Sequence, residues 1–593
     1  MIAAVLAPSI AYRDERMGRI AERAGTPAAR AVSGEVVVAQ WGAPPLGRGS
    51  MAIAGQLALP AGHPDLDITR MGGDFAVAAP FGDGLLLARA ALAGRPLYYW
   101  RDASTGSVIA CSRLAHLLAA LDHVPGLNVE RLASMAIGWP HFDLSATAHT
   151  GVHRVGLGEA LSFGLHRETT RRTHVLPLEP LLEASVEDVA LQLREKVMSA
   201  VRRSIEGARS VAVLAGGGVD SSGLLAAAVA LARGATPREV RAITLDFGGP
   251  GDDRPYMKSL ASALGIEPLR IPPRALGRYL RSTLVVDGSP AAWPTLAMDI
   301  GLAIAAREKG AEVLLSGQCG DDLVDGDPRA IAQLAGQGHL LDAVRSAVRM
   351  RLYWNTTAPE RIFSFVVRPL GAAAVPWLAR ASHRFRNRAK EDWLGPRVHD
   401  FLAVSAATNR QRYSQDVRLR ARHPMLAARY VGDLVDGQGQ VSAATGIATA
   451  SPFLDQELVS FVTRIPPLML IDGGRLKGLY RRAMHGLIPE DVRMRPDKAD
   501  FTYGYGELVE ASGGFGALED LASMDRLGQL GIIEPRAYLR AYRRFTSEAA
   551  QSSLWLDLLW SALPVEAFVR ARERGELPTA ATSESRCPTA AVA

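Results

Sequence analysis

The sequence predicts an α/β protein with two domains, and three observations support this fold class. The chain has 593 residues, which is too long for a single hydrophobic core. Residues 1 to about 170 contain short strand-like segments separated by glycine and proline. From about Val186 the pattern changes to alternating helices and strands, which is typical of a parallel sheet with helices on both faces.

These patterns predict the domain boundaries. We expect a strand-rich domain over residues 1–175, an α/β domain over residues 186–574 and a disordered tail, rich in small and polar residues, over residues 575–593. The strands expected in the second domain are Val211–Ala215, Ala242–Leu245, Leu269–Ile271 and Glu312–Leu315. Nucleotide sites in such sheets lie at the carboxyl ends of the strands.

Composition narrows the class of protein. A hydrophobic content of 48% and a charged content of 22% indicate a soluble globular chain. The net charge of +6 is small for this length, so a mild surface bias explains it better than a nucleic-acid-binding surface. Three widely spaced cysteines form neither a disulfide framework nor a zinc pattern, which favours the cytoplasm. We interpret Met1–Ala11 as a strand, and no apolar run reaches membrane-spanning length.

A glycine-rich loop is the strongest local signal. The strand Val211–Ala215 runs into Gly216-Gly217-Gly218-Val219-Asp220-Ser221-Ser222, and an alanine-rich helix follows. Glycines allow the backbone to approach a ligand, and the free N–H groups of a helix start attract anions. No lysine follows, so the loop is not of the Walker type. The segment resembles the pyrophosphate loop of ATP pyrophosphatases, which split ATP into AMP and pyrophosphate.

Further motifs extend this resemblance to nearly the whole chain. In order and spacing they resemble the synthetase domain of the asparagine synthetase family. The C-terminal motifs are Ser316-Gly317-Gln318-Cys319-Gly320-Asp321-Asp322-Leu323, Pro452-Phe453-Leu454-Asp455, Gly473-Gly474-Arg475-Leu476-Lys477, Leu487-Ile488-Pro489-Glu490 and Arg495-Pro496-Asp497-Lys498-Ala499-Asp500-Phe501. The segments that resemble that family's glutaminase domain are Gly73-Asp74-Phe75, Leu85-Leu86-Leu87-Ala88-Arg89 and Arg95-Pro96-Leu97-Tyr98-Tyr99.

The resemblance implies a fold, two cofactors and a set of site residues. The fold would be an N-terminal glutaminase-like α+β sandwich of the N-terminal-nucleophile (Ntn) type, followed by a parallel-sheet ATP pyrophosphatase domain. ATP and Mg²⁺ would be required, with Asp220 and Asp321 as metal ligands; alone, Asp220 could equally be a helix N-cap. The residues expected to bind ATP are Leu214, Gly216, Gly217, Gly218, Asp220, Ser221, Ser222, Leu245, Ser316 and Gly317.

Two lysines complete the expected catalytic set together with Asp321. Only six of the 67 basic residues are lysine, and where arginine has nearly displaced lysine, the scarcity slightly favours a chemical requirement for each remaining lysine. The resemblance implies that Lys498 stabilises negative charge in the transition state. Lys477 would contact pyrophosphate or a carboxylate. For Lys498 the alternative is a solvated surface lysine.

Several departures from the family pattern bear on function. The family's glutaminase uses an N-terminal cysteine, whereas Ile2 is the second residue here and no cysteine precedes Cys111. The family's Asn-Gly-Glu glutamine clamp aligns with Ala54-Gly55-Gln56. We therefore expect no glutaminase activity. Gly216 stands where the family usually has serine, and Gln318 replaces an acid or phenol, which leaves the general base unassigned.

The leading hypothesis is an ATP-dependent macrolactam synthetase for a lasso peptide. It would adenylate an Asp or Glu side chain of the core peptide and close the ring with the N-terminal amine. The resemblance implies a leader-binding protein and a leader protease as partners. Three alternatives are a β-lactam-type small-molecule synthetase, an ammonia-dependent asparagine synthetase and a catalytically dead scaffold.

Overall fold

The computed structural model describes most of the chain. The described residues are 1–41, 51–58, 72–139, 141–174, 176, 179–234, 237–249, 252–328, 330–350, 356–370, 392–405, 430–498, 501–547 and 561–576. Residues 577–593 of the predicted tail lie outside them. The predicted domain boundaries stay a prediction.

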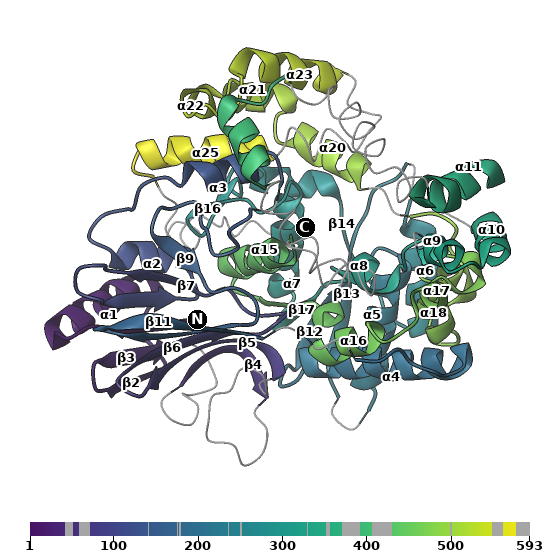
Figure 1. Ribbon diagram of the computed structural model, residues 1–593, viewed down its shortest axis with the longest axis horizontal. Helices are drawn as coiled ribbons and strands as arrows, with labels where there is room; N and C mark the ends of the chain where they lie inside the picture. Colours follow the sequence, from purple (N-terminus) through teal and green to yellow (C-terminus); the bar gives the residue numbers. More distant parts are fainter. Residues whose placement is uncertain are drawn as a thin grey trace.

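The N-terminal part contains two antiparallel sheets packed face to face (Figure 1). The first sheet has the order β2 (Ala29–Ser33), β3 (Val36–Gln40), β1 (Ile2–Leu6), β8 (Val108–Cys111), β7 (Tyr98–Arg101) and β9 (Val152–Arg154). The second has the order β11 (Arg167–Thr173), β10 (Glu159–Gly164), β6 (Gly84–Arg89), β5 (Gly72–Phe81) and β4 (Ala52–Ala58).

Side-chain alternation along β1 explains this layering. Ile2, Ala4 and Leu6 point into the space between the two sheets. Ala3 and Val5 point the other way, toward helices α1 (Ile10–Ala24) and α2 (Leu114–Ala120). The expected layered α+β arrangement is present, whereas its assignment to the Ntn type stays a prediction.

The C-terminal part is built on a parallel sheet, as the sequence predicts. Its order is β14 (Leu269–Ile271), β13 (Glu239–Leu245), β12 (Ser210–Leu214), β17 (Val313–Leu315) and β18 (Ala448–Ala450), and every neighbouring pair is parallel. The four expected strands are confirmed, and β18 is an additional one.

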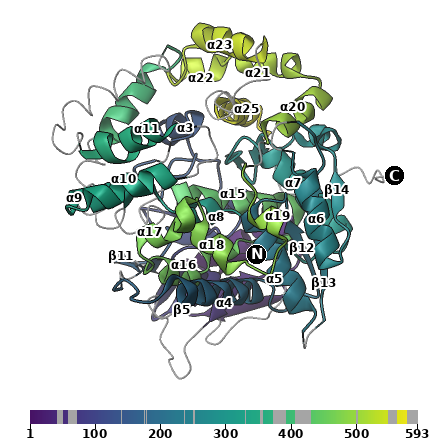
Figure 2. The same cartoon turned by 90° about the vertical axis from the view of Figure 1, so that its right-hand side faces the viewer.

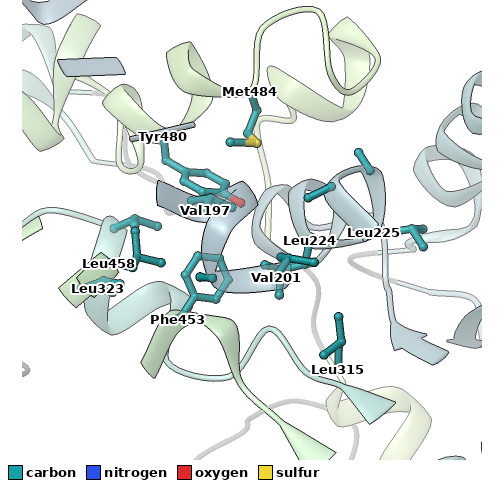
Figure 3. Close-up of a cluster of buried hydrophobic side chains, with 14 of the residues drawn as sticks. Val197, Val201, Leu224, Leu225, Leu315, Leu323, Phe453, Leu458, Tyr480 and Met484 are labelled. Atoms are coloured by element: carbon teal, nitrogen blue, oxygen red, sulfur yellow. The ribbon is translucent and has the colours of Figure 1, made fainter. Parts of the chain in front are cut away.

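Both faces of this sheet are covered. Val211 and Val213 of β12 pack with α4 (Val186–Ser204) and α5 (Val219–Ala232), whereas Ala212 faces α7 (Leu296–Glu308) and α15 (Tyr430–Thr445). Figure 3 shows the first of these cores, where Phe453 and Tyr480 lie beside Val197 of α4 and Leu224 of α5. The two cores hold the carboxyl ends of β12 and β17 in fixed positions.

The remaining helices surround the sheet and the loops at its carboxyl edge. Helices α16 (Gln456–Val462) and α18 (Gly478–Ala483) lie against α4 (Figure 2). The other described elements are α3 (Val129–Ala136), α6 (Arg254–Leu264), η2 (Pro273–Tyr279), β15 (Val285–Val286), β16 (Ser289–Pro290), α8 (Gly320–Val324), α9 (Ala330–Gly336), α10 (Leu340–Arg349), α11 (Ala358–Ile362), η3 (Phe363–Val367), η6 (Pro452–Leu454), α16 (Gln456–Val462), α17 (Pro467–Leu470), η7 (Asp472–Gly474), α18 (Gly478–Ala483), α19 (Glu490–Arg493), α20 (Thr502–Ala511), η8 (Phe515–Leu518), α21 (Glu519–Ala522), α22 (Asp525–Gln529), α23 (Pro535–Ser547) and α25 (Ala562–Glu573). Within the described ranges, none of the helices combines the length and the apolarity needed to cross a membrane.

A buried charge cluster joins the antiparallel sheets to the parallel sheet. Arg131 of α3 and Arg154 of β9 each lie 2.7 Å from Asp433 of α15, and Arg154 also lies 2.6 Å from Asp436. Arg89 of β6 contacts Asp436 at 2.6 Å. Burial raises the pKa of Asp433, but the two arginines outweigh it and hold the pKa well below its usual range. The cluster therefore anchors the N-terminal sheets on α15.

Replacement of Asp433 by alanine tests this anchor. Because Asp433→Ala leaves two buried arginines without their shared partner, we expect a loss of about 3–5 kcal/mol in the free energy of unfolding. The folded pKa lies below the unfolded value of about 4, so this stabilisation is present above pH ~4 and is lost as the pH falls below it. Denaturant midpoints from pH 3 to 8 measure both effects.

The matched control is Asp342→Ala, which removes a carboxylate whose side chain is 59% exposed and pairs with Arg345 on the surface. Its effect should stay below about 1 kcal/mol. Equal effects of the two substitutions would contradict the anchoring role.

Candidate active site

The loop after β12 is shaped by steric limits at two glycines. Gly217 has φ +71°, in the left-handed region that favours glycine, and a Cβ there would lie 2.8 Å from Tyr256 Cβ. A Cβ on Gly216 would lie 2.5 Å from Asp253 Oδ2. The N-cap of α5 is Gly218, so Asp220 lies in the first turn of the helix and does not have the alternative role of N-cap.

The loop after β17 approaches the same helix start. Cys319 adopts the left-handed conformation with φ 65°, and α8 begins at the next residue. A Cβ on Gly320 would lie 2.9 Å from Asp220 Oδ2, so glycine is needed for this close approach. Since β12 and β17 are parallel neighbours, their carboxyl ends bring Asp220 and Asp321 together.

Two lysines from the C-terminal motifs enter this acidic centre. The buried Lys477 Nζ contacts both Asp220 Oδ2 and Asp321 Oδ1, and it lies 3.8 Å from Asp325 Oδ1. Lys477 also has a positive φ of 59°, and its backbone N–H donates to Asp325 O at 2.9 Å. Lys498 Nζ contacts the other oxygen of Asp321. The structure thus brings together all four charged residues that the sequence singled out.

Burial and the lysines set the protonation of the acids. Burial raises the pKa of Asp220, although Lys477 opposes it. For Asp321, burial is outweighed by Lys477 and Lys498, and its pKa falls to about 2. Burial raises the pKa of Asp325 to about 7, against the effect of Lys477. Asp321 is therefore ionised at neutral pH.

The chemistry of the donors fits a nucleotide-bound Mg²⁺. In the described part of the chain no group of three or more His, Cys, Asp or Glu side chains could hold a metal by itself. Asp220 Oδ1, however, is buried without a hydrogen-bond partner, and Asp321 lies next to it on the shared Lys477. Mg²⁺ in phosphate sites takes one or two carboxylates, with phosphate and water oxygens as the other ligands. Asp220 and Asp321 could supply these two, and the ion would neutralise charge on departing pyrophosphate.

A cavity of about 360 Å³ lies between the two loops and the lysines. Most of the residues predicted to bind ATP or to act in catalysis line it. They are Leu214, Gly216, Gly218, Asp220, Ser221, Leu245, Ser316, Gly317, Asp321, Lys477 and Lys498. Gly217 is not among the lining residues, and Ser222 is completely buried beneath the loop.

The sequence did not reveal one ion pair that packs against the glycine loop. Asp253 and Arg495 line the cavity and form a buried ion pair at 2.5 Å. The Arg495 guanidinium also lies 4.2 Å from the centre of the Tyr256 ring. Arg495 begins the motif Arg495–Phe501, so the sequence held a signal for it as a candidate site residue. Asp253 lies outside every motif. Together they fill the space above Gly216 and Gly217.

A second cavity of about 410 Å³ adjoins the first. The shared wall consists of Leu214, Thr295, Asp299, Ser316 and Gln318. The Gln438 side chain of α15 donates to Gln318 Oε1 and to Ser451 Oγ, so Gln318 is held in a neutral amide network. The second cavity therefore provides further space beside the glycine loop.

In the described part of the N-terminal sheets, the backbone at the aligned clamp is closely packed and the cysteine nearest in sequence is buried. Gly55 of β4 packs so closely on β5 that a Cβ would lie 1.9 Å from Asp74 O, and Asp74 pairs with Arg95 at 2.7 Å. Cys111 is fully buried in β8, and burial raises its pKa to about 12. Its thiol is neutral and inaccessible at physiological pH.

Comparisons with known proteins agree with the quoted motifs. A family model described as asparagine synthase matches residues 192–570, which is more than half of the chain. One similar protein is "Asparagine synthetase [glutamine-hydrolyzing] 3" of Bacillus subtilis (strain 168), which is 22% identical over 426 residues. This alignment covers 69% of the present chain and 64% of the relative.

The contact between Gly216 and Asp253 predicts how serine is tolerated in the loop. Because the new Cβ in Gly216→Ser overlaps Asp253 Oδ2, we expect a loss of about 1–3 kcal/mol in stability. In an Asp253→Ala background, which already lacks the buried ion pair with Arg495, the further loss caused by Gly216→Ser should be smaller than in the wild type. Denaturant unfolding measures the stability, and isothermal titration with Mg·ATP measures nucleotide affinity.

Gly218→Ser is the matched control, because a Cβ there lies no closer than 3.9 Å to Ser221 Oγ. We expect it to leave stability unchanged or slightly raised, since serine is a good N-cap. Wild-type stability of Gly216→Ser would contradict the steric argument.

The shared lysine predicts strong coupling between Lys477 and Asp220. Lys477→Met leaves the buried carboxylate of Asp220 without its cation, whereas Asp321 keeps Lys498, so we expect a loss of about 3 kcal/mol in the free energy of unfolding. The double variant Lys477→Met/Asp220→Asn should be less destabilised than the sum of the single changes, because the charge that Lys477→Met strands on Asp220 is then absent. A double-mutant cycle in urea measures this coupling.

Lys196→Met serves as the control, because Lys196 Nζ lies 3.4 Å from Glu457 in a surface pair whose side chains are 39% and 59% exposed. Its cost should be below about 1 kcal/mol. Additive effects of Lys477→Met and Asp220→Asn would argue against a shared ion pair.

Proposed function

The chain belongs to the asparagine synthase family, and from this premise we propose that it is an ATP-dependent, AMP-forming macrolactam synthetase. It adenylates an Asp or Glu side chain of a lasso core peptide and closes the ring with the N-terminal amine. The product side consists of AMP, pyrophosphate and an isopeptide bond. Magnesium, a leader protease and a leader-binding protein belong to the same proposal.

The observation that carries the proposal is the second cavity beside the nucleotide loop. A molecule the size of water or ammonia occupies about 30 Å³ in a liquid, whereas this cavity measures about 410 Å³. Pockets of that size accommodate organic ligands. The cavity therefore has room for an organic substrate that carries its own amine.

The N-terminal sheets support an internal amine as the nucleophile. Ammonia production from glutamine needs an activated thiolate. Cys111 is buried in β8 and protonated at neutral pH. Arg95 neutralises Asp74 at the aligned clamp and donates to Thr449 O at 2.7 Å in β18. We propose that these sheets brace the synthetase site and have no glutaminase activity.

Ammonia-dependent asparagine formation is the second candidate. The printed name of the Bacillus subtilis relative supports it, together with the intact Asp220, Asp321 and Lys498. A β-lactam-type closure of a small amino acid would also use an internal amine. These three reactions give different products from the same adenylation site.

One assay separates them. The full chain is incubated with ATP, Mg²⁺ and, in parallel, candidate core peptides, β-amino acids, or aspartate with ammonium. AMP is then measured by chromatography and the products by mass. We expect AMP together with loss of one water from a peptide. Asparagine as the product would overturn the proposal in favour of the second candidate, and ADP would exclude all three reactions.

We expect the substitution Lys498→Met to lower the rate of AMP formation in that assay. Because an ammonium directed at developing negative charge contributes mainly in the transition state, AMP formation should fall about 100- to 1,000-fold. The matched control is Lys309→Met, which removes an exposed ammonium at the C-cap of α7 and should retain wild-type activity. Full activity of Lys498→Met would show that this lysine has no part in the reaction.

A further inference from the structure

The lining of the second cavity includes one ionisable side chain, a carboxylate. Its lining residues are Leu214, Trp293, Pro294, Thr295, Asp299, Leu314, Ser316, Gln318, Leu434, Gln438, Val441 and Thr449. Of these, Asp299 alone carries a charge at neutral pH. The same residue also lines the nucleotide cavity, so its carboxylate lies at the boundary of the two.

Asp299 lies in the first turn of α7 and is held by one neighbour. The indole N–H of Trp293 donates to Asp299 Oδ2 at 2.7 Å. Among the described residues, no lysine, arginine or histidine forms an ion pair with Asp299. The pKa of its carboxyl is set by burial and by the hydrogen bond from Trp293. A carboxylate in a largely apolar cavity is costly unless a cation or a proton compensates it. Within the described residues, the Asp299 carboxylate therefore has no cationic side chain as its partner.

We infer that Asp299 binds the ammonium group of the acceptor amine in the second cavity and accepts a proton from it. The ligand class is a primary alkylammonium. This inference rests on the proposed function for the fate of the amine, but binding of the ammonium can be measured without any reaction.

The other acids of the site are poorly placed for this task. Asp321 and Asp220 both contact Lys477, and Asp321 also contacts Lys498. Gln318 is an amide and does not accept a proton at neutral pH. Asp299 faces the second cavity with only Trp293 as its partner in the described structure.

The chemistry balances with one base. The bound ammonium transfers a proton to the Asp299 carboxylate, and the nitrogen lone pair then attacks the acyl carbon of the adenylate. A C–N bond forms, the C–O bond to the AMP phosphate breaks, and AMP leaves with that electron pair. The second nitrogen proton is released to water. Burial raises the pKa of Asp299 to about 6, against the hydrogen bond from Trp293, so this acid is more basic than an exposed aspartate.

Ethylammonium chloride is the probe for this site. The full chain is saturated with Mg²⁺ and α,β-methylene-ATP, which resists cleavage at the α–β position, and ethylammonium is titrated by calorimetry at pH 8. We expect saturable millimolar binding to the wild type and at least tenfold weaker binding to Asp299→Asn. Affinity for α,β-methylene-ATP should agree within twofold. Binding should weaken as the pH falls through about 6, because the carboxylate becomes protonated.

Trp293→Phe distinguishes ligand binding from a structural role. It removes the indole donor and retains the carboxylate, so ethylammonium affinity should stay within threefold of wild type. If Asp299 only fastens Trp293, both variants lose thermal stability alike and ethylammonium affinity is the same in Asp299→Asn as in wild type.

Three results would overturn the inference. They are no binding of ethylammonium to the wild type, equal binding to Asp299→Asn, and a parallel loss of α,β-methylene-ATP affinity, which would place Asp299 against the nucleotide. Asp299-dependent binding without AMP formation from any peptide would leave this amine site standing and reject the proposed reaction. If AMP forms from a peptide but ethylammonium binds equally to the wild type and to Asp299→Asn, the proposed reaction would stand and the amine site at Asp299 would be rejected.

Discussion

The contact of Lys477 with Asp220 and Asp321 is the interaction on which the rest of the site depends. It joins three segments far apart in the sequence, namely the loops after β12 and β17 and the turn before α18. Because a buried charge without a partner costs several kcal/mol, each of these side chains fixes the position of the others. The backbone of Lys477 accepts a positive φ to make the contact. The charged groups thus hold one another in place, and a preorganised arrangement of this kind lowers the reorganisation cost of catalysis.

The antiparallel sheets contact the elements around this site through α15 and β18. Helix α15 receives the arginines of the buried cluster on Asp433 and Asp436, and the same helix carries Gln438 into the second cavity. Arg95 reaches Thr449 O, and the Thr449 hydroxyl donates to Gln438 O at 3.3 Å. Changes in the N-terminal sheets can therefore alter the shape of the second cavity without touching the nucleotide loop.

Local patterns in the sequence predicted the parallel sheet and the glycine loop between β12 and α5, because β-branched strands and clustered glycines act over a few residues. Strand β18 consists of three small residues and is defined only by its pairing with β17, so no local signal identified it. Asp253 limits Gly216 from a distant helix start, which requires the three-dimensional structure to recognise. Similarly, Ser222 belongs to the loop motif, but the helical rotation of α5 turns it into the core.

The position of the neutral Gln318 indicates how the site could work with an amine that belongs to its substrate. A free amine in dilute solution needs a strong base and a high concentration to compete with water for an acyl-adenylate. An amine carried by the same molecule has a high effective concentration once it is oriented, so a weaker base is sufficient. Leu434, Val441 and Leu314 also give the second cavity apolar walls, which limit the water available for hydrolysis. The volume of the second cavity, its apolar walls and the Asp299 carboxylate thus support the proposal that the acceptor is an amine carried by the substrate.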